Sequence, residues 1–211
     1  MRRAIAKNGG ITIAILPTSR VGVLPRDDIN DEKILSCEEL TDLHREIDLC
    51  DGVILQGGLT SANYEVETAR YCISRNIPLF ASCAGFNNVV RALGSDTFEI
   101  LNNKRHNNMK KKFAHNILIK KNSLLYDIFR EKILPVNSIH TMFAYDRDIK
   151  NACITAHSDD GFVEAIEVPT NDFCLAVKWH PEIMVDYDDR ENKIFEKFIA
   201  ACRNRINLNN K

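Results

Sequence analysis

A lone cysteine between small residues is the first place in this sequence where chemistry is expected. Residues 78–81 read as a short buried strand, Cys83 follows, and residues 86–93 have the apolar spacing of a helix. A strand that turns sharply into a helix strains the corner residue and points its side chain outward, and it tolerates only small neighbours, here Ala81 and Gly85. The pattern predicts a nucleophile elbow, with the sulfur near a helix N-terminus that favours the thiolate. The alternative is a core cysteine, because free cysteines are among the most buried residue types.

A histidine and a carboxylate far downstream favour the catalytic interpretation. His180-Pro181-Glu182 closes an apolar strand that we predict over residues 174–179. At period two, His180 and Glu182 point to the same side of that strand, while Pro181 cannot donate to a ladder and marks its end. A carboxylate beside an imidazole fixes the tautomer and stabilises the imidazolium. Cys83, His180 and Glu182 together supply the parts of thiol-based acyl transfer.

The elements that position these residues alternate between helix and strand in the first half of the chain. Three helices are predicted: residues 1–8 closed by Gly9-Gly10, a helix from the capping box Ser36-Cys-Glu-Glu39 towards Ile47, and one whose buried face is Ala62, Val66, Ala69 and Ile73. Apolar runs predict buried strands over residues 11–16 (ended by Pro17), 52–56 and 78–81. This alternation indicates a parallel sheet covered on both faces.

The second half of the chain changes character. Strands are predicted over residues 98–101, 115–119, 133–136, 152–157, 162–168 and 174–179, with a short helix over 123–130. Asp159-Asp-Gly161 is a hairpin signal between two of these strands. A last helix capped by Asp188 or Asp189 buries Ile194, Phe198, Ile199 and Cys202, and the residues from Asn204 onward are expected to form a loose tail. No repeat or linker divides the chain, so we expect residues 1–211 to form a single domain.

The composition is ordinary for a soluble globular protein. The net charge of −1 lacks the electrostatic footprint of a nucleic-acid binder, and no apolar stretch approaches the length of a membrane span. Seven cysteines without a CxxC pair argue against a disulfide framework or a zinc site and for a reducing cytosol. The N-terminal apolar run is too short for a signal peptide. These features predict a cytoplasmic enzyme or binding domain.

Residues 104–112 hold five basic residues in nine. The favoured interpretation is a solvated loop, because no aromatic platform accompanies the charge. The alternative is a loop that borders the active site and attracts an anionic substrate.

Five segments together carry a more specific signal. They are Asp51-Gly-Val-Ile-Leu-Gln-Gly-Gly58, Cys83-Ala-Gly85, Val136-Asn-Ser-Ile-His140, Asp160-Gly-Phe-Val-Glu-Ala-Ile-Glu167 and Val177-Lys-Trp-His-Pro-Glu182. With this order and spacing the chain resembles the class I glutamine amidotransferase-like superfamily and, within it, the gamma-glutamyl-gamma-aminobutyrate hydrolase family (peptidase family C26). The third and fourth segments favour this family over ordinary glutaminase domains. The resemblance covers nearly the whole chain and implies a flavodoxin-like three-layer α/β sandwich, mostly parallel, with antiparallel strands in the C-terminal half.

The resemblance also implies roles for individual residues. Cys83 is then the nucleophile, His180 the general base and later the acid, and Glu182 the group that orients His180. The backbone amides of Gly58 and Ala84 would form the oxyanion hole. The implied substrate-binding residues are Gly57, Asn87, Asn137, Ser138 and His140. For Asn137 and Ser138 an ordinary turn after a strand is an equally open interpretation. No metal or organic cofactor is implied.

The sequence also departs from the family pattern. Asn87 stands where a glutamine is usual, Ala84 where a larger residue is common, and Thr141 where the family has a second histidine, while residues 59–62 replace acidic residues. These departures bear on the substrate more than on the reaction type. The family opens with a strand and most of a helix before the segment that matches residues 2–17. Either the sequence is truncated or the sheet is built differently; a missing strand would expose a sheet edge, which a homodimer could cover.

Three functions remain open. The first is a hydrolase that cleaves a gamma-glutamyl amide or isopeptide bond of a small metabolite through a glutamyl thioester on Cys83. The second is a glutaminase component that passes ammonia to a separate synthetase partner. The third is a binding module with a degenerate site. Hydrolysis without any partner would separate the first from the other two; neither nucleic acid nor a membrane is an expected partner.

Overall fold

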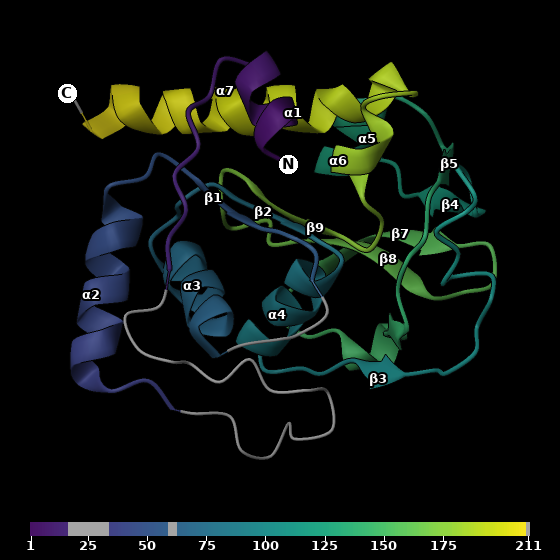
Figure 1. The fold of residues 1–211 in the computed structure, drawn as a ribbon, viewed down its shortest axis with the longest axis horizontal. Coiled ribbons are helices and arrows are strands. Elements are labelled where there is room, and N and C mark those ends of the chain that lie inside the picture. Colours follow the sequence, from purple (N-terminus) through teal and green to yellow (C-terminus); the bar gives the residue numbers. More distant parts are fainter. Residues whose placement is uncertain (17–33, 59–62, 210–211) are drawn as a thin grey trace.

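A computed structural model describes residues 1–16, 34–58 and 63–209 of the chain. Within these residues a twisted sheet of seven strands lies between two layers of helices (Figure 1). Its strands, in sheet order, are β1 (Val53–Leu55), β2 (Leu79–Ser82), β9 (Cys174–Val177), β8 (Val163–Glu167), β7 (Cys153–Ser158), β4 (His115–Ile119) and β5 (Ile133–Val136). A separate antiparallel pair joins β3 (Phe98–Glu99) to β6 (Met142–Phe143).

The pairing of the strands explains how distant parts of the sequence meet. β1, β2 and β9 are parallel, whereas the pairs β9–β8, β8–β7, β7–β4 and β4–β5 are antiparallel. The predicted α/β architecture, with antiparallel strands in the C-terminal half, is confirmed. In the β2–β9 register, Ser82 lies opposite Val177. The carboxyl ends of these two strands therefore meet at one edge, where ligand sites of parallel sheets form.

Two hydrophobic cores hold the helices against the sheet. One face packs against α1 (Arg2–Lys7), α5 (Leu124–Phe129), α6 (Pro181–Met184) and α7 (Asn192–Asn209), and the other against α2 (Cys37–Asp48), α3 (Asn63–Ser74) and α4 (Ala84–Ala92) (Figure 1). Alternate residues of β2 enter opposite cores: Phe80 packs edge-on against Phe195, while Ala81 faces the α4 side. Truncating a buried phenylalanine such as Phe80 typically costs about 3–5 kcal/mol of stability.

Several local signals are confirmed. Ser36 and Glu39 exchange both hydrogen bonds of a capping box at the start of α2. The Asp159-Asp-Gly161 turn joins β7 and β8 as the predicted hairpin. Residues 104–112 are largely exposed, as expected of a solvated loop, although His106 within them is fully buried. Pro17, the predicted end of the first strand, and residues 59–62, which include Ala62 of the predicted third helix, lie outside the described residues.

Two predicted elements are wrong. Residues 11–16 form no strand, and Ile11, Ile13 and Leu16 are 96%, 64% and 71% exposed. An apolar run alone does not make a strand, because a strand also needs a partner in register, and the only neighbour of β1 in the described sheet is β2. The expected loose tail from Asn204 is helical to Asn209.

The C-terminal helix α7 also carries a tertiary contact near its end. The guanidinium of Arg205 donates to the carbonyl oxygen of Cys50 at 2.9 Å, which ties this part of α7 to the loop before β1. None of the described helices combines the length and apolar composition that crossing a bilayer requires.

Candidate active site

Cys83 is the corner between β2 and α4. Its backbone has φ 52° and ψ −104°, a positive φ that is uncommon and strained for a non-glycine residue. Gly85 follows it in the first turn of α4, where a Cβ atom would lie 2.2 Å from the carbonyl oxygen of Leu55. Only glycine fits there, because the clash would be with the backbone of β1. The predicted sharp turn from strand to helix at Cys83 is confirmed, as is the need for a small residue at Gly85.

The thiol of Cys83 differs from other buried thiols in the chain. It is 7% exposed, and its Sγ lies 3.8 Å from the carbonyl oxygen of Ile139. Burial raises the pKa of Cys83, but the hydrogen bond with His180 and the positive charges of His180 and Lys178 outweigh it, so the pKa is lowered. Burial instead raises the pKa of Cys72 to about 12. Cys72 thus has the raised pKa expected of a core cysteine, whereas the lowered pKa of Cys83 favours its thiolate.

His180 and Glu182 form the pair expected from the sequence, but on a different element. β9 ends at Val177, and His180 is the N-cap of the short helix α6, with Pro181 as its first residue. The predicted strand through residue 179 and its period-two geometry are thus wrong, because proline is pre-organised for the first position of a helix. Nδ1 of His180 lies 2.7 Å from Oε1 of Glu182 across the first helical turn.

The surroundings of His180 favour its charged form. Burial lowers its pKa, but hydrogen bonds to Cys83 and Glu182 and the negative charges of both partners outweigh burial and raise the pKa to about 10. A thiol with a lowered pKa bonded to an imidazole with a raised pKa can exist as a thiolate–imidazolium pair. That pair can attack an electrophilic carbon and protonate a leaving group.

Asn137 fixes the backbone of His180. Its side-chain nitrogen donates to the carbonyl oxygen of His180 at 3.0 Å, and its side-chain oxygen accepts from the His180 amide at 2.8 Å. Asn137 is only 3% exposed, and its amide positions the histidine. This role was not predicted from the sequence, and the substrate role of Asn137 stays a prediction. An asparagine just after β5 carries no local signal that its partner is forty-three residues away.

Gly57 lies where the side chains of Cys83 and His180 approach each other. A Cβ atom at this position would lie 2.4 Å from Cε1 of His180 and 3.2 Å from Cβ of Cys83. Gly58, the next residue, is exposed, and Ala84 is the first residue of α4. The Ala84 amide therefore has no acceptor within its helix. The oxyanion role of the Gly58 and Ala84 amides stays a prediction.

A buried lysine is the other residue that the sequence analysis did not single out. Lys178 is fully buried, its Nζ donates to the side-chain oxygen of Asn87 at 2.8 Å, and it lies 5.1 Å from the centre of the Phe86 ring. Its charge helps to lower the pKa of Cys83. A charged residue at the end of an otherwise apolar run in the sequence could have indicated that Lys178 has a specific role. Asn87, predicted to bind substrate, thus contacts Lys178, and its substrate role stays a prediction.

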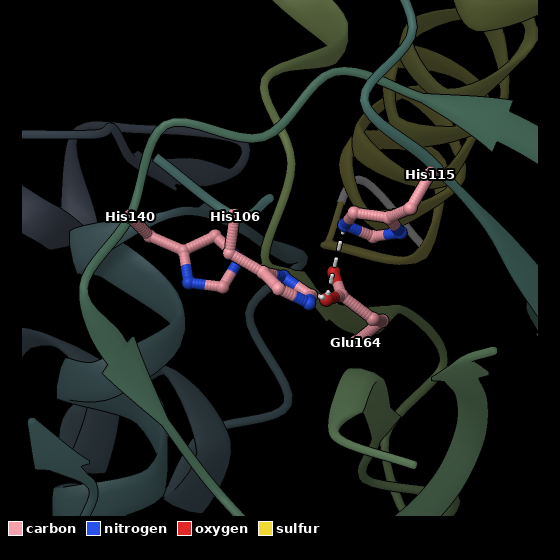
Figure 2. A group of neighbouring side chains, drawn as sticks. All are labelled: His106, His115, His140 and Glu164. Atoms are coloured by element: carbon pink, nitrogen blue, oxygen red, sulfur yellow. Dashed lines mark ion pairs between the residues drawn. The ribbon is translucent and has the colours of Figure 1, made fainter. Parts of the chain in front are cut away.

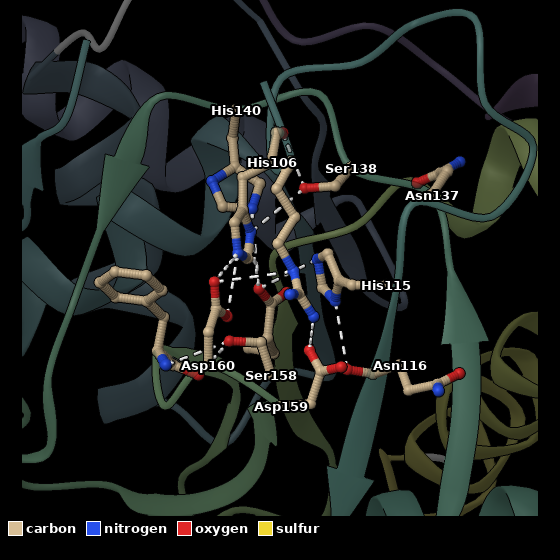
Figure 3. Close-up of polar contacts among 12 residues, drawn as sticks. His106, His115, Asn116, Asn137, Ser138, His140, Ser158, Asp159 and Asp160 are labelled. Carbon is tan, nitrogen blue, oxygen red and sulfur yellow. Dashed lines mark hydrogen bonds and ion pairs between the residues drawn. The ribbon is translucent and has the colours of Figure 1, made fainter. Parts of the chain in front are cut away.

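Ser138 and His140 point into a second polar cluster. Ser138 is fully buried and donates to the carbonyl oxygen of His106 at 2.7 Å (Figure 3). Nδ1 of His140 lies 3.0 Å from the carbonyl oxygen of Met142. The structure therefore brings Cys83, His180 and Glu182 together with Gly57 and Asn137, while the side chains of Ser138 and His140 contact a neighbouring group. Their substrate roles stay predictions.

Comparison with known proteins identifies the family and the fold. Residues 59–182 match the sequence profile of the Peptidase C26 family. The gamma-glutamyl-gamma-aminobutyrate hydrolase PuuD of Escherichia coli (strain K12) is 30% identical over 146 residues, which cover 64% of this chain and 57% of that enzyme. The chain thus spans little more than half the length of that relative. CTP synthase of Methanosphaera stadtmanae is 26% identical over 74% of this chain and 34% of its own length.

A solved structure confirms the fold. The glutaminase domain of Trypanosoma brucei CTP synthase, with bound acivicin, superposes with a TM-score of 0.65 at 22% identity, covering 82% of this chain and 81% of that one. This likeness shows a class I glutamine amidotransferase-like fold. The profile match extends over more than half of the sequence and includes the elbow and the His180–Glu182 pair. The chain therefore belongs to the peptidase C26 family.

Proposed function

We propose that this protein is a cysteine hydrolase that cleaves a gamma-glutamyl amide or isopeptide bond of a small metabolite and releases glutamate and an amine. The observation that carries the proposal is the strained Cys83, whose pKa is lowered by the neighbouring His180, together with the 2.7 Å contact between His180 and the Glu182 carboxylate. The similarity to a gamma-glutamyl-gamma-aminobutyrate hydrolase supports the gamma-glutamyl half of the substrate.

The first half of the reaction forms a thioester. The Cys83 thiolate attacks the gamma-carbonyl carbon, and the backbone amides of Gly58 and Ala84 donate hydrogen bonds to the carbonyl oxygen, on which negative charge develops. The imidazolium of His180 then protonates the leaving nitrogen as the carbon–nitrogen bond breaks. Glu182 keeps the ring oriented and stabilises its charge throughout.

The second half restores the enzyme. After the amine leaves, neutral His180 takes a proton from a water molecule, whose oxygen attacks the thioester carbon. The carbon–sulfur bond breaks, glutamate leaves, and the Cys83 thiolate and His180 imidazolium are regenerated. No redox step or external reductant is required, and the products are one glutamate and one amine per turnover.

A second candidate is a glutaminase that passes ammonia to a separate synthetase. The similarity to CTP synthase over 74% of this chain favours it. The same triad would then act on glutamine, and turnover would rise when the partner binds. The two candidates differ in substrate and in their need for a partner.

The deciding experiment is glutamate release by the purified protein alone, from a panel of gamma-glutamyl amides that includes glutamine. If the protein is a hydrolase, we expect glutamate release from a substituted amide in preference to glutamine, and no release in Cys83→Ala. Cys37→Ala is the matched control, because Cys37 is an exposed thiol at the start of α2 and its loss should leave the rate unchanged. Release from glutamine alone, weak until a synthetase is added, would instead support the glutaminase. Turnover retained in Cys83→Ala would overturn both.

A further inference from the structure

Three histidines and a glutamate form a buried cluster beside the active site. They are His106, His115, His140 and Glu164, which are 0%, 7%, 5% and 0% exposed. His115 and Glu164 belong to β4 and β8 of the sheet, whereas His106 and His140 come from the loops that precede β4 and follow β5. Figure 2 shows His106 and His115 approaching the Glu164 carboxylate from two adjacent directions, with His140 beside His106. The ring centres of His106 and His115 lie 4.3 Å apart. Four segments distant in sequence thus direct side chains into one interior space.

The polar atoms of this cluster approach one another without forming hydrogen bonds. Oε1 of Glu164 lies 3.5 Å from Nδ1 of His106, 3.6 Å from Nε2 of His115 and 3.7 Å from Nε2 of His140. These separations exceed the roughly 2.7–3.2 Å of a good N–H···O bond. Both carboxylate oxygens, with Nε2 of His115 and of His140, are buried atoms without a hydrogen-bond partner. Leaving such atoms unsatisfied is costly.

The opposite nitrogen of each ring is held by an acceptor, which fixes the tautomer. Nε2 of His106 lies 3.1 Å from both carboxylate oxygens of Asp160, and Nδ1 of His115 lies 3.2 Å from the carbonyl oxygen of Asn116 (Figure 3). Nδ1 of His140 is bound in the same way by Met142. Each anchored nitrogen therefore carries the hydrogen, and the other nitrogen presents a lone pair towards Glu164. The Ser138 hydroxyl lies 3.5 Å from Nδ1 of His106 but gives its hydrogen to the carbonyl oxygen of His106 instead.

Three lone pairs that converge on a carboxylate repel one another unless a cation lies between them. We propose that His106, His115, His140 and Glu164 bind a divalent transition-metal ion, with Zn²⁺ the best match. The four ligand atoms all lie within 4.8 Å of one another. Zinc bonds of about 2.0–2.2 Å place tetrahedral ligand atoms about 3.3–3.6 Å apart. The separations of 3.5–3.7 Å between Glu164 and the three histidines are close to this value, whereas the wider pairs, which extend up to 4.8 Å, would contract further when the ion binds.

The surroundings of the cluster match a metal centre in two further respects. A histidine that binds a metal generally donates its other N–H to a carboxylate or a carbonyl, which is the arrangement of all three rings. The two carboxylates of Glu164 and Asp160 also favour a cation here, although Asp160 already pairs with Arg105 at 3.7 Å and the positive charge of Lys178 acts on Glu164. Four protein ligands leave no open coordination position, which is typical of a structural site. His115 also lines a surface cavity of about 460 Å³, through which an ion could enter.

The ion would stabilise the segment of residues 137–140, which contacts both His180 and Cys83. His140 lies at the end of the segment that carries Asn137, which holds the His180 backbone, and Ile139, whose carbonyl lies near Cys83. Bound metal would fix this segment to β4 and β8. This assignment gives His140 a structural role in place of the substrate contact expected from the sequence. It does not depend on which bond the active site cleaves.

Metal analysis of the full-length protein tests the proposal. The protein is purified without a polyhistidine tag or chelator, and its metals are measured by inductively coupled plasma mass spectrometry. We expect about one equivalent of zinc per chain, or stoichiometric uptake of added Zn²⁺ that survives gel filtration. Chelation should lower the Tm, and Zn²⁺ should restore it. Co²⁺ in place of zinc should give the intense visible absorption of a four-coordinate centre.

Variants locate the ion. His115→Ala and Glu164→Gln should retain less than about a tenth of the wild-type metal, and their Tm should not respond to Zn²⁺. His157→Ala is the matched control, since His157 pairs with Asp146 outside the cluster and its loss should leave the metal content unchanged. If the two variants fail to fold, the wild-type titration decides. Wild-type protein that neither holds nor takes up metal, with a Tm indifferent to Zn²⁺ and chelator, would overturn the proposal, as would undiminished metal in both variants.

Discussion

Adding one methyl group at Gly57 should disable the active site without unfolding the protein. The new Cβ would lie 2.4 Å from Cε1 of His180, whereas an ordinary contact begins at 3.4 Å, so one of the two groups must move by about 1 Å. The ring is held at 2.7 Å by Glu182 and its backbone by Asn137, and it faces Cys83 on the other side. A misplacement of this size costs about a factor of 10² in kcat/KM, or about 2.7 kcal/mol of transition-state stabilisation.

The assay compares kcat/KM and Tm of Gly57→Ala with those of the wild type. Gly57 has no positive φ, so alanine introduces no backbone strain there. Gly52→Ala is the matched control, because its Cβ would lie equally close, 2.4 Å, to Sγ of Cys202 in the core under α7. The control should lower the Tm and keep its kcat/KM per folded molecule. Wild-type kcat/KM in Gly57→Ala would refute the reasoning, since it would mean that His180 does not work from this position.

Three further changes test the charges around the site. Glu182→Gln removes the charge that stabilises the His180 imidazolium, so kcat should fall by a factor of about 10² or more; an unchanged kcat would show that another group orients the ring. In His180→Ala the pH midpoint for alkylation of Cys83, monitored by peptide mass spectrometry, should rise. Burial then raises the pKa of Cys83 without the opposing effect of the imidazolium, and an unchanged midpoint would contradict the pairing of Cys83 with His180. Burial raises the pKa of Glu191, which accepts a bond from Trp179, from 4.5 to about 8. The protonated Glu191 therefore contributes stability that is fully present below pH 4.5 and is lost as the pH rises through 8. Glu191→Gln should raise the Tm above pH 8 and much less below pH 4.5. Equal Tm shifts at both pH values would contradict the raised pKa of Glu191.

Local patterns in the sequence were sufficient for the elbow but not for everything around it. The order of strand, Cys83 and helix follows from short-range apolar spacing and from small neighbours, and the structure has that order. His180 and Glu182 were correctly paired, yet on a predicted strand. Proline at the start of a helix and proline at the end of a strand leave the same mark in a sequence.

Non-local contacts account for what the sequence did not predict. Asn137 contacts His180, and the histidine cluster closes only when β4, β8 and two loops come together, so no spacing rule of the CxxC kind would detect it. The strand expected over residues 11–16 failed for the same reason, because strand formation depends on a partner elsewhere in the chain. The helical structure of the residues after Asn204 was not predicted because the contact that holds them, between Arg205 and the carbonyl oxygen of Cys50, joins residues that are also distant in sequence.

The most direct test of the account is whether a glutamyl group becomes attached to Cys83 during turnover. The protein is mixed with a gamma-glutamyl amide that it hydrolyses, quenched in acid, and digested for peptide mass spectrometry. We expect one glutamyl adduct on the peptide that contains Cys83, sensitive to hydroxylamine as a thioester is, and neither adduct nor glutamate release in Cys83→Ala. Glutamate release that persists in Cys83→Ala, or an adduct on any other residue, would contradict it.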